Sequence, residues 1–389
     1  MPSSRHTPGD TGSRVRANRI KVASVGGILA CLALALGIVV GSGSEQVPAS
    51  RAASTITVPK GLTDHQVAGQ RFVAGFTGTS VPADFKRAVR TGRIGGAILF
   101  ADNVPTRAIA RSVTSQLRRI KRPRQLRKFP LPIMIDQEGG LVKRLSGAPT
   151  VSAEVMGSRG PSFSRNQGRL TGRNLRNAGI NVNLAPVLDV ARPGGNIASD
   201  DRGFGSTAAK VSQTAISFAK GLQANGVAAT AKHFPGLGAV KLNTDDAVQT
   251  IRLSKAALRK VDEAPYRPFI KSGGRLVMVG TAIYPALGRK PAAFESKVVQ
   301  GELRDRLGFD GVTITDSLEA VAAQSFGSSK KVSIVAAKAG MDILLFGSLG
   351  EALKGEDALA KRLKSGKLKR AAFEKSVGRI LALRSTFPG

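Results

Sequence analysis

Eight short apolar runs, separated by longer segments, constrain the fold of this chain more than any other feature. They occupy residues 71–76, 95–101, 131–136, 180–190, 227–234, 275–283, 311–316 and 342–347. Continuous apolar strands are typical of a parallel sheet that is covered on both faces by helices. Eight such units predict an α/β fold, a single-domain (β/α)8 barrel of the TIM type. An open doubly wound sheet fits less well, because no Gly-x-Gly-x-x-Gly turn follows any strand.

The segments between the apolar runs have the periodicity of helices. In residues 208–226, apolar side chains recur on one helical face. Glycines that can end a helix in the left-handed conformation stand shortly before several runs, at Gly179, Gly226, Gly273 and Gly340. Strand and helix therefore alternate along residues 57–389, and we expect no second domain after the barrel.

The N-terminal region has a different composition. A basic head at residues 1–21 precedes an uncharged apolar stretch at residues 22–41, which is long enough to cross a bilayer. The positive flank predicts a cytoplasmic N-terminus and an extracytoplasmic body. An uncleaved signal anchor, a cleaved signal peptide and lipidation at Cys31, the single cysteine, are the three interpretations. Residues 42–56 are predicted to be a flexible linker.

The charge of the chain is strongly positive. Its net charge is +33, and residues 56–389 keep +29 of it, since the first 55 residues contain six basic and two acidic side chains. The densest block, residues 118–128, has seven basic side chains but neither Trp nor Tyr. Nucleic-acid-binding surfaces usually interleave aromatic residues. The block therefore predicts attraction to an anionic cell-wall polymer or membrane surface, and no specific nucleic-acid partner.

Charged residues close several of the apolar runs. Asp136, Asp189 and Asp316 each end or nearly end a run, and Lys232 with His233 occur near the end of another. A buried charge without a partner costs several kcal/mol, and active sites of such barrels lie where the strands end. We therefore expect these side chains to share one site. A helix N-cap is the alternative role for Asp316, and a fully hydrogen-bonded rim histidine is the alternative for His233.

Five segments resemble, in family order, the motif series of glycoside hydrolase family 3. They are DQEGG at 136–140, LAPVLDV at 184–190, DRGFG at 201–205, KHFPGLG at 232–238 and LGFDGVTITDSLE at 307–319. The likeness is greatest to the single-domain bacterial β-N-acetylglucosaminidases, which trim peptidoglycan-derived sugars. It implies a barrel that acts on carbohydrate as an exported retaining β-glycosidase, with cell-wall-derived amino-sugar glycosides as the expected substrates.

The resemblance also implies roles for individual residues. Asp316 would be the nucleophile that forms a covalent glycosyl-aspartate. The substrate-binding positions would be Asp136, Arg202, Lys232, His233 and Asp189. No metal or cofactor is expected, since the sequence has no HExxH, EF-hand or Walker-type segment and no clustered His and Cys ligands.

The general acid/base is where this chain departs from the family. Members usually carry Asp-Ser-His a few residues beyond KHFPG, but these positions are Asn243, Thr244 and Asp245 here. Three interpretations remain open: Asp245 is the acid/base, Asp246 takes the role after a one-residue shift, or the loop is inactive and the barrel only binds sugar.

Two further departures affect the expected specificity. Leu141 stands where the family tends to have arginine, and Thr281 stands where a histidine is frequent. Both remove charge from the expected rim of the sugar site. Specificity for a β-glucoside or β-xyloside is therefore the enzymatic alternative to N-acetylglucosamine.

Overall fold

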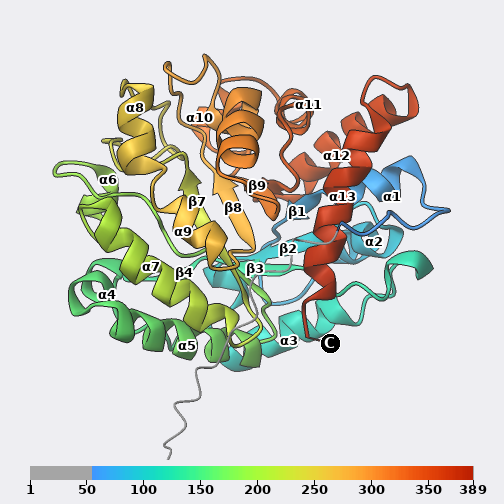
Figure 1. Cartoon of the computed structure of the whole chain (residues 1–389). Coiled ribbons are helices and arrows are strands. Elements are labelled where there is room, and N and C mark those ends of the chain that lie inside the picture. Colours follow the sequence, from blue (N-terminus) through green and yellow to red (C-terminus); the bar gives the residue numbers. More distant parts are fainter. Residues whose placement is uncertain (1–54, 389) are drawn as a thin grey trace, which may run out of the picture. The chain divides into compact units, whose positions relative to one another are not determined.

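Eight parallel strands form one nearly closed sheet in the computed structural model, which describes residues 55–388 (Figure 1). The strands are β1 (Phe72–Ala74), β2 (Gly96–Leu99), β3 (Ile133–Ile135), β6 (Val182–Asn183), β7 (Ala228–Phe234), β8 (Leu276–Val279), β9 (Val312–Thr315) and β10 (Leu344–Phe346). Their order in space is β10-β1-β2-β3-β6-β7-β8-β9. A parallel bridge between Ile314 and Ile343 joins the two ends of this order. The barrel-like arrangement and all eight predicted strand positions are thereby confirmed.

Helices lie around the outside of the strands (Figure 1). They are α1 (Asp64–Gly69), α2 (Ala83–Thr91), α3 (Arg107–Arg118), α4 (Ala153–Arg159), α5 (Pro161–Asn177), α6 (Asn196–Ser199), α7 (Ala208–Gln223), α8 (Lys255–Ala257), α9 (Tyr266–Lys271), α10 (Val321–Gln324), α11 (Ser329–Ala339), α12 (Leu349–Lys364) and α13 (Arg370–Ser385). Shorter or wider helical turns are η1 (Ala101–Asn103), η2 (Arg124–Leu126), η3 (Leu258–Asp262), η4 (Ala292–Phe294) and η5 (Lys297–Arg306). A hairpin of β4 (Gln137–Gly139) and β5 (Val142–Lys143) follows β3. The four predicted helix-ending glycines all have φ between 75° and 100°.

Alternation along each strand divides the core into an inner and an outer part. Val73 belongs to the inner cluster, while its neighbours Phe72 and Ala74 belong to the outer cluster beneath the helices. On α13, Ile380 and Leu383 join the inner cluster. This helix closes the amino end of the barrel and buries apolar area there, which is the main source of stability in such a core.

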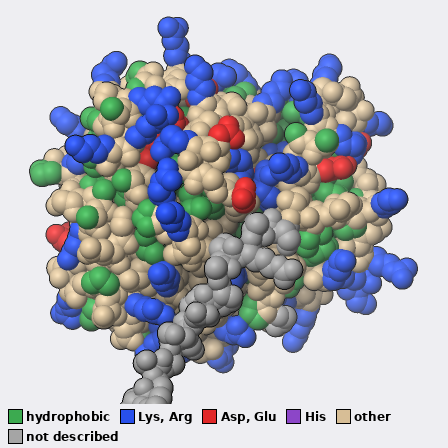
Figure 2. Space-filling view, in the orientation of Figure 1, with side chains coloured by type: hydrophobic (Ala, Val, Ile, Leu, Met, Phe, Trp, Pro, Cys, Tyr) green, Lys and Arg blue, Asp and Glu red, His purple; other side chains and the backbone are tan. Residues whose placement is uncertain are grey.

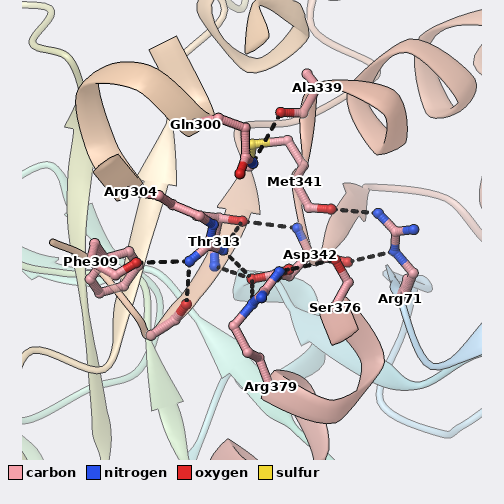
Figure 3. Close-up of polar contacts among 11 residues, drawn as sticks. Arg71, Gln300, Arg304, Phe309, Thr313, Ala339, Met341, Asp342, Ser376 and Arg379 are labelled. Atoms are coloured by element: carbon pink, nitrogen blue, oxygen red, sulfur yellow. Dashed lines mark hydrogen bonds and ion pairs between the residues drawn. The ribbon is translucent and has the colours of Figure 1, made fainter. Parts of the chain in front are cut away.

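An ion cluster lies at the amino end of the barrel, close to the bridge between Ile314 and Ile343 that closes the sheet (Figure 3). Asp342, just before β10, is wholly buried and accepts hydrogen bonds from Arg304 at 2.7 Å, Arg379 at 2.6 Å and the backbone N–H of Thr313 at 3.0 Å. Arg71 donates to the main-chain oxygen of Asp342 at 3.1 Å. Burial acts to raise the pKa of Asp342, but the charges of Arg304 and Arg379 lower it to about 2. We call these four charged residues the amino-end cluster.

The predicted head at 1–21 and apolar stretch at 22–41, with most of the linker at 42–56, lie outside the described residues. Within residues 55–388, none of the helices combines the length and hydropathy that a bilayer crossing requires. The basic block 118–128 runs from the end of α3 towards β3, and six of its seven basic side chains are exposed. Because it precedes β3, it lies near the amino end of the barrel.

Candidate active site

Charged side chains expected at the strand ends meet in one cluster, which we call the carboxyl-end cluster. Lys232 Nζ lies 2.7 Å from Asp136 Oδ1 and 2.7 Å from Glu138 Oε1. Arg202 donates two hydrogen bonds to Glu138, each of 2.9 Å. Asp136 and Glu138 follow β3, Arg202 lies between α6 and α7, and Lys232 is in β7. The fold thus brings together three of the predicted binding residues and adds a second carboxylate.

These four charges stabilise one another. Burial by itself acts to raise the pKa of Glu138, but the charges of Lys232 and Arg202 hold that pKa well below its ordinary value. Burial likewise acts to lower the pKa of Lys232, and the charges of Asp136 and Glu138 raise it instead. The Lys232 side chain is 3% exposed, whereas those of Asp136 and Arg202 keep 16% and 12%. The cluster therefore reaches solvent through Asp136 and Arg202.

An irregularity in β7 places two consecutive side chains at this site. Adjacent residues of a regular strand point to opposite faces of the sheet. The register of β7 against β8 shifts between Ala231 and Phe234, and such irregularities re-aim side chains. Lys232 and His233 both contact carboxylates at this end of the barrel, on Asp136 and Asp189 respectively.

Asp189 lies behind His233. It is wholly buried, and its Oδ2 atom is 2.7 Å from His233 Nδ1. Its Oδ1 accepts from the backbone N–H groups of His233 at 3.1 Å and Leu237 at 2.7 Å. Because a carboxylate only accepts, Nδ1 carries the proton and Nε2 faces elsewhere. Within the described structure Asp189 contacts His233 and the backbone behind it, and its role toward a substrate stays a prediction.

His233 itself is not fully hydrogen-bonded at its ring. Across residues 55–388, its Nε2 atom has no hydrogen-bond partner, while the side chain is 6% exposed. The alternative of a satisfied rim histidine therefore accounts for only one of the two ring nitrogens. The other is left for a ligand.

Asp316 stands directly after β9. Its backbone N–H donates to the carbonyl of Val279 at 3.0 Å, and its Oδ1 accepts from the N–H of Ser317 at 2.9 Å. The N-cap of the following helix α10 is Ala320, so the helix-cap alternative for Asp316 is wrong. The carboxylate is half-buried, and its Oδ2 atom has no hydrogen-bond partner among residues 55–388, which leaves that oxygen available as a nucleophile.

The loop that lacks the family's histidine is docked beside Asp316. Asn243 Oδ1 accepts from the N–H of Asp245 at 3.1 Å, which forms a tight turn. The N–H of Val321, at the start of α10, donates to the carbonyl of Asp245 at 3.0 Å, and that of Ala322 donates to the carbonyl of Thr244 at 3.3 Å. The turn and the segment that carries Asp316 are thereby joined.

The electrostatics of Asp245 agree with this docking. Partial desolvation of its carboxyl group and the negative charge of Asp316 raise the pKa of Asp245, although the residue as a whole is exposed to solvent. His233 and Arg202 act on the pKa of Asp245 in the opposite direction. Asp246 is exposed beside it, and its charge contributes to the same rise. A carboxyl of raised pKa beside a second carboxylate is the pattern of an acid and a nucleophile.

Sequence reasoning missed Glu138. The signal was present, since Glu138 follows Asp136 by two residues and alternate residues of an extended segment share a face. Two residues depart from the family pattern at the expected rim of the sugar site. Leu141 is 74% exposed, and Thr281 is buried.

No metal-binding group is evident in the described region. Between residues 55 and 388, no three or more His, Cys, Asp or Glu side chains come together in a way that could hold a metal ion.

Comparison with known sequences identifies relatives of the whole barrel. The model of the glycosyl hydrolase family 3 N-terminal domain matches residues 63–383. An uncharacterised secreted glycosyl hydrolase of Arthroderma benhamiae is 39% identical over 329 residues, which are 82% of this chain and 92% of that protein. A β-hexosaminidase of Nitrosomonas eutropha is 32% identical over 65% of this chain and 73% of the relative.

Comparison with solved structures points to the same family. A glycoside hydrolase family 3 β-N-acetylglucosaminidase from Paenibacillus superposes with a TM-score of 0.79 at 33% identity; the match covers 84% of this chain and 64% of that one, so the chain spans less than two thirds of its length. A β-N-acetylhexosaminidase from Beutenbergia cavernae gives 0.78 at 30% identity, over 83% of this chain and 98% of the other. The resemblance of the five motifs is thus confirmed, and the chain belongs to glycosyl hydrolase family 3.

Proposed function

We propose that the protein is a retaining exo-β-N-acetylglucosaminidase that acts outside the cytoplasm on cell-wall-derived amino-sugar glycosides. Its homologues include β-hexosaminidases and a secreted glycosyl hydrolase. The observation that carries the proposal is the docking of the Asp245 turn onto α10, which holds a second carboxyl group within electrostatic range of Asp316. Retaining glycosidases commonly use two carboxyl groups in this way.

The reaction would proceed in two balanced steps. Asp316 attacks the anomeric carbon while Asp245 gives its proton to the glycosidic oxygen, so the bond to the leaving group breaks and a glycosyl-aspartate forms. Asp245, now ionised, takes a proton from water, whose oxygen attacks the anomeric carbon and releases Asp316. Asp136, Lys232 and His233 hold the hydroxyl groups of the sugar.

The raised pKa of Asp245 suits this assignment. A general acid has to be protonated at the start of the reaction, and a raised pKa extends the protonated form to higher pH. An ordinary aspartate would be almost fully ionised near neutral pH. The desolvation and the charge of Asp316 that raise the pKa are thus the features that let Asp245 replace the missing histidine.

The location of the protein is part of the same proposal. Residues 22–41 would direct export as an anchor or a signal peptide, with residues 42–56 as a linker to the barrel at 57–389. The exposed basic block 118–128 would hold an anionic cell-wall polymer or membrane surface. Because the block lies near the amino end, the strand ends that carry the site stay open to substrate.

One observation favours a second candidate function. The family's acid/base histidine is absent, which is what an anchored barrel that binds cell-wall sugar without cleaving it would show. Among catalytic alternatives, Leu141 and Thr281 lower the charge of the rim and favour β-glucosides or β-xylosides.

The test is hydrolysis of 4-nitrophenyl β-N-acetylglucosaminide by the full chain and by two variants. We expect Asp316→Ala to lose about 10⁴-fold or more in kcat, as loss of a nucleophile does in other enzymes, and Asp245→Ala to lose about 10²- to 10⁴-fold. Because 4-nitrophenolate leaves without protonation, the second loss falls on the water-dependent step, so azide restores turnover and gives the β-azide. A parent that binds N-acetylglucosamine but hydrolyses neither this substrate nor its glucoside and xyloside analogues would instead be the sugar-binding barrel.

A further inference from the structure

The exposed large hydrophobic side chains of the described residues all lie in segments that follow the carboxyl ends of barrel strands. Leu141 is in the β4–β5 turn, Leu242 (58% exposed) and Val248 (44%) follow β7, and Val321 (47%) begins α10 after β9. No other helix, and no segment at the amino end between residues 55 and 388, carries one. Elsewhere the surface is strongly basic, and Figure 2 shows one face on which Lys and Arg are widespread and acidic side chains are few.

Three of these side chains belong to the segments that meet at Asp245. Leu242 directly precedes Asn243, whose side chain accepts the N–H of Asp245 at 3.1 Å. Val248 follows three residues after Asp245. Val321 is the residue whose N–H holds the carbonyl of Asp245 at 3.0 Å. The proposed acid is therefore flanked by exposed apolar groups from both sides of its docking contact.

The carboxyl-end cluster supplies the charged part of the site. It contains Asp136, Glu138, Lys232 and Arg202, which are paired with one another and suit the hydroxyl groups of a sugar. A general acid gives its proton to the oxygen that links sugar and leaving group, so it stands between the two. The surface beyond Asp245, away from the charged cluster, is then the surface that the leaving group meets. Apolar side chains there lose their contact with water only when a substrate covers them.

We propose that Leu242, Val248 and Val321 form an apolar aglycone subsite, and that the enzyme prefers β-glycosides whose leaving group presents an alkyl or aryl surface. This inference rests on the proposed function, because it takes Asp245 as the acid.

A series of methyl, butyl and hexyl β-N-acetylglucosaminides tests the subsite with the full chain. The three alcohols differ little in acidity, so differences in kcat/KM report contact with the protein. A fully buried methylene contributes about fourfold, and we expect about twofold for each added methylene at a partly open rim. Leu242→Ser and Val321→Ser should each flatten the series. Lys241→Ser, next to Leu242 on the same exposed segment, is the matched control and should keep the wild-type slope.

The outcomes separate this inference from the proposed function. Hydrolysis of the methyl glycoside with a flat series would leave the function standing and overturn the subsite. If nothing in the series is hydrolysed, calorimetric binding decides: equal affinities overturn the subsite, and tighter hexyl binding that Leu242→Ser removes supports it. If the two variants keep the slope but lose binding to anionic phospholipid vesicles, the apolar face contacts membrane and the subsite is wrong.

Discussion

The two ends of the barrel each hold a buried ion cluster, and they differ in their access to solvent. At the amino end, Asp342 is wholly buried under Arg304 and Arg379, and its oxygens are taken up by protein donors (Figure 3). At the carboxyl end, the charges of two acids and two bases balance, and Asp136 keeps 16% of its side chain exposed. The same residue types therefore close the fold at one end and remain available to a ligand at the other.

The difference follows from what surrounds each cluster. The amino-end cluster is sealed by α13 and joins residues far apart in the sequence, such as Arg71 and Asp342, which are 271 positions apart. Removing Asp342 there takes away a carboxylate that is wholly buried and that pairs with two arginines. The carboxyl-end cluster lies at the open strand ends, where a sugar or water can replace a lost partner.

The largest effect on stability is expected from Asp342→Asn. The change removes the counter-charge of Arg304 and Arg379, whose side chains are only 11% and 10% exposed. Loss of one partner of a buried ion pair typically costs about 3–5 kcal/mol of the free energy of unfolding. Urea denaturation measures it. Asp357→Asn is the control, because it breaks a surface pair with Lys361 and should cost less than about 1 kcal/mol. Equal losses in the two variants would contradict the special role of the amino end.

Glu138→Gln is expected to act mainly on activity. Arg202 and Lys232 lose a shared counter-charge and shift, and a displacement of about 1 Å can cost about 100-fold in rate. The free energy of unfolding should fall by about 1–2 kcal/mol, since Asp136 and water compensate in part. Steady-state kinetics with parallel denaturation curves give both quantities. The control is Glu302→Gln on η5, which breaks the ion pairs of Glu302 with Arg259 on η3 and Arg306 on η5 and should leave kcat/KM unchanged. A comparable loss of rate in this variant would show that the effect is global.

Acid should weaken the amino end by a smaller amount. The folded pKa of Asp342, about 2, lies below its ordinary value of 3.8, so its contribution is present above the ordinary value and is lost as pH falls towards 2. The shift corresponds to about 2 kcal/mol. The measurement is the difference in unfolding free energy between wild type and Asp342→Asn from pH 5 to pH 2, which should shrink. A gap that stays constant would contradict the assignment.

The smallest effect is expected from Asp246→Asn. The negative charge of Asp246 contributes to the raised pKa of Asp245, so its removal lowers that pKa. The alkaline limb of the kcat/KM profile, which reports loss of the protonated acid, should then move to lower pH with little change at the optimum. Loss of activity at every pH would identify Asp246 as the acid/base instead.

Local patterns in the sequence accounted for much of the fold. The strands β1, β3 and β9 lie within predicted apolar runs because burial on both faces leaves an unbroken apolar signal. Asp316 and Lys232 could be predicted as site residues because each closes such a run. The structure was needed to exclude the helix-cap alternative for Asp316, because the N-cap of α10 is Ala320.

The roles of other residues depended on distant partners. Asp189 was expected at the sugar site, and the structure shows in addition that it is hydrogen-bonded to the side chain of His233, 44 positions away. Glu138 finds its partner Arg202 at a distance of 64 positions. Nothing local to either residue indicates these contacts.

The sequence by itself thus determined which segments are strands, where the helices between them end, and which family the chain resembles. Only the tertiary structure decided which charges are paired, that Asp189 is hydrogen-bonded to His233, and that the Asp245 turn contacts α10 close to Asp316. The physical reason is that hydrophobic period and turn chemistry act within a few residues. Pairing of buried charges is decided when the closed barrel excludes water from groups that lie far apart along the chain.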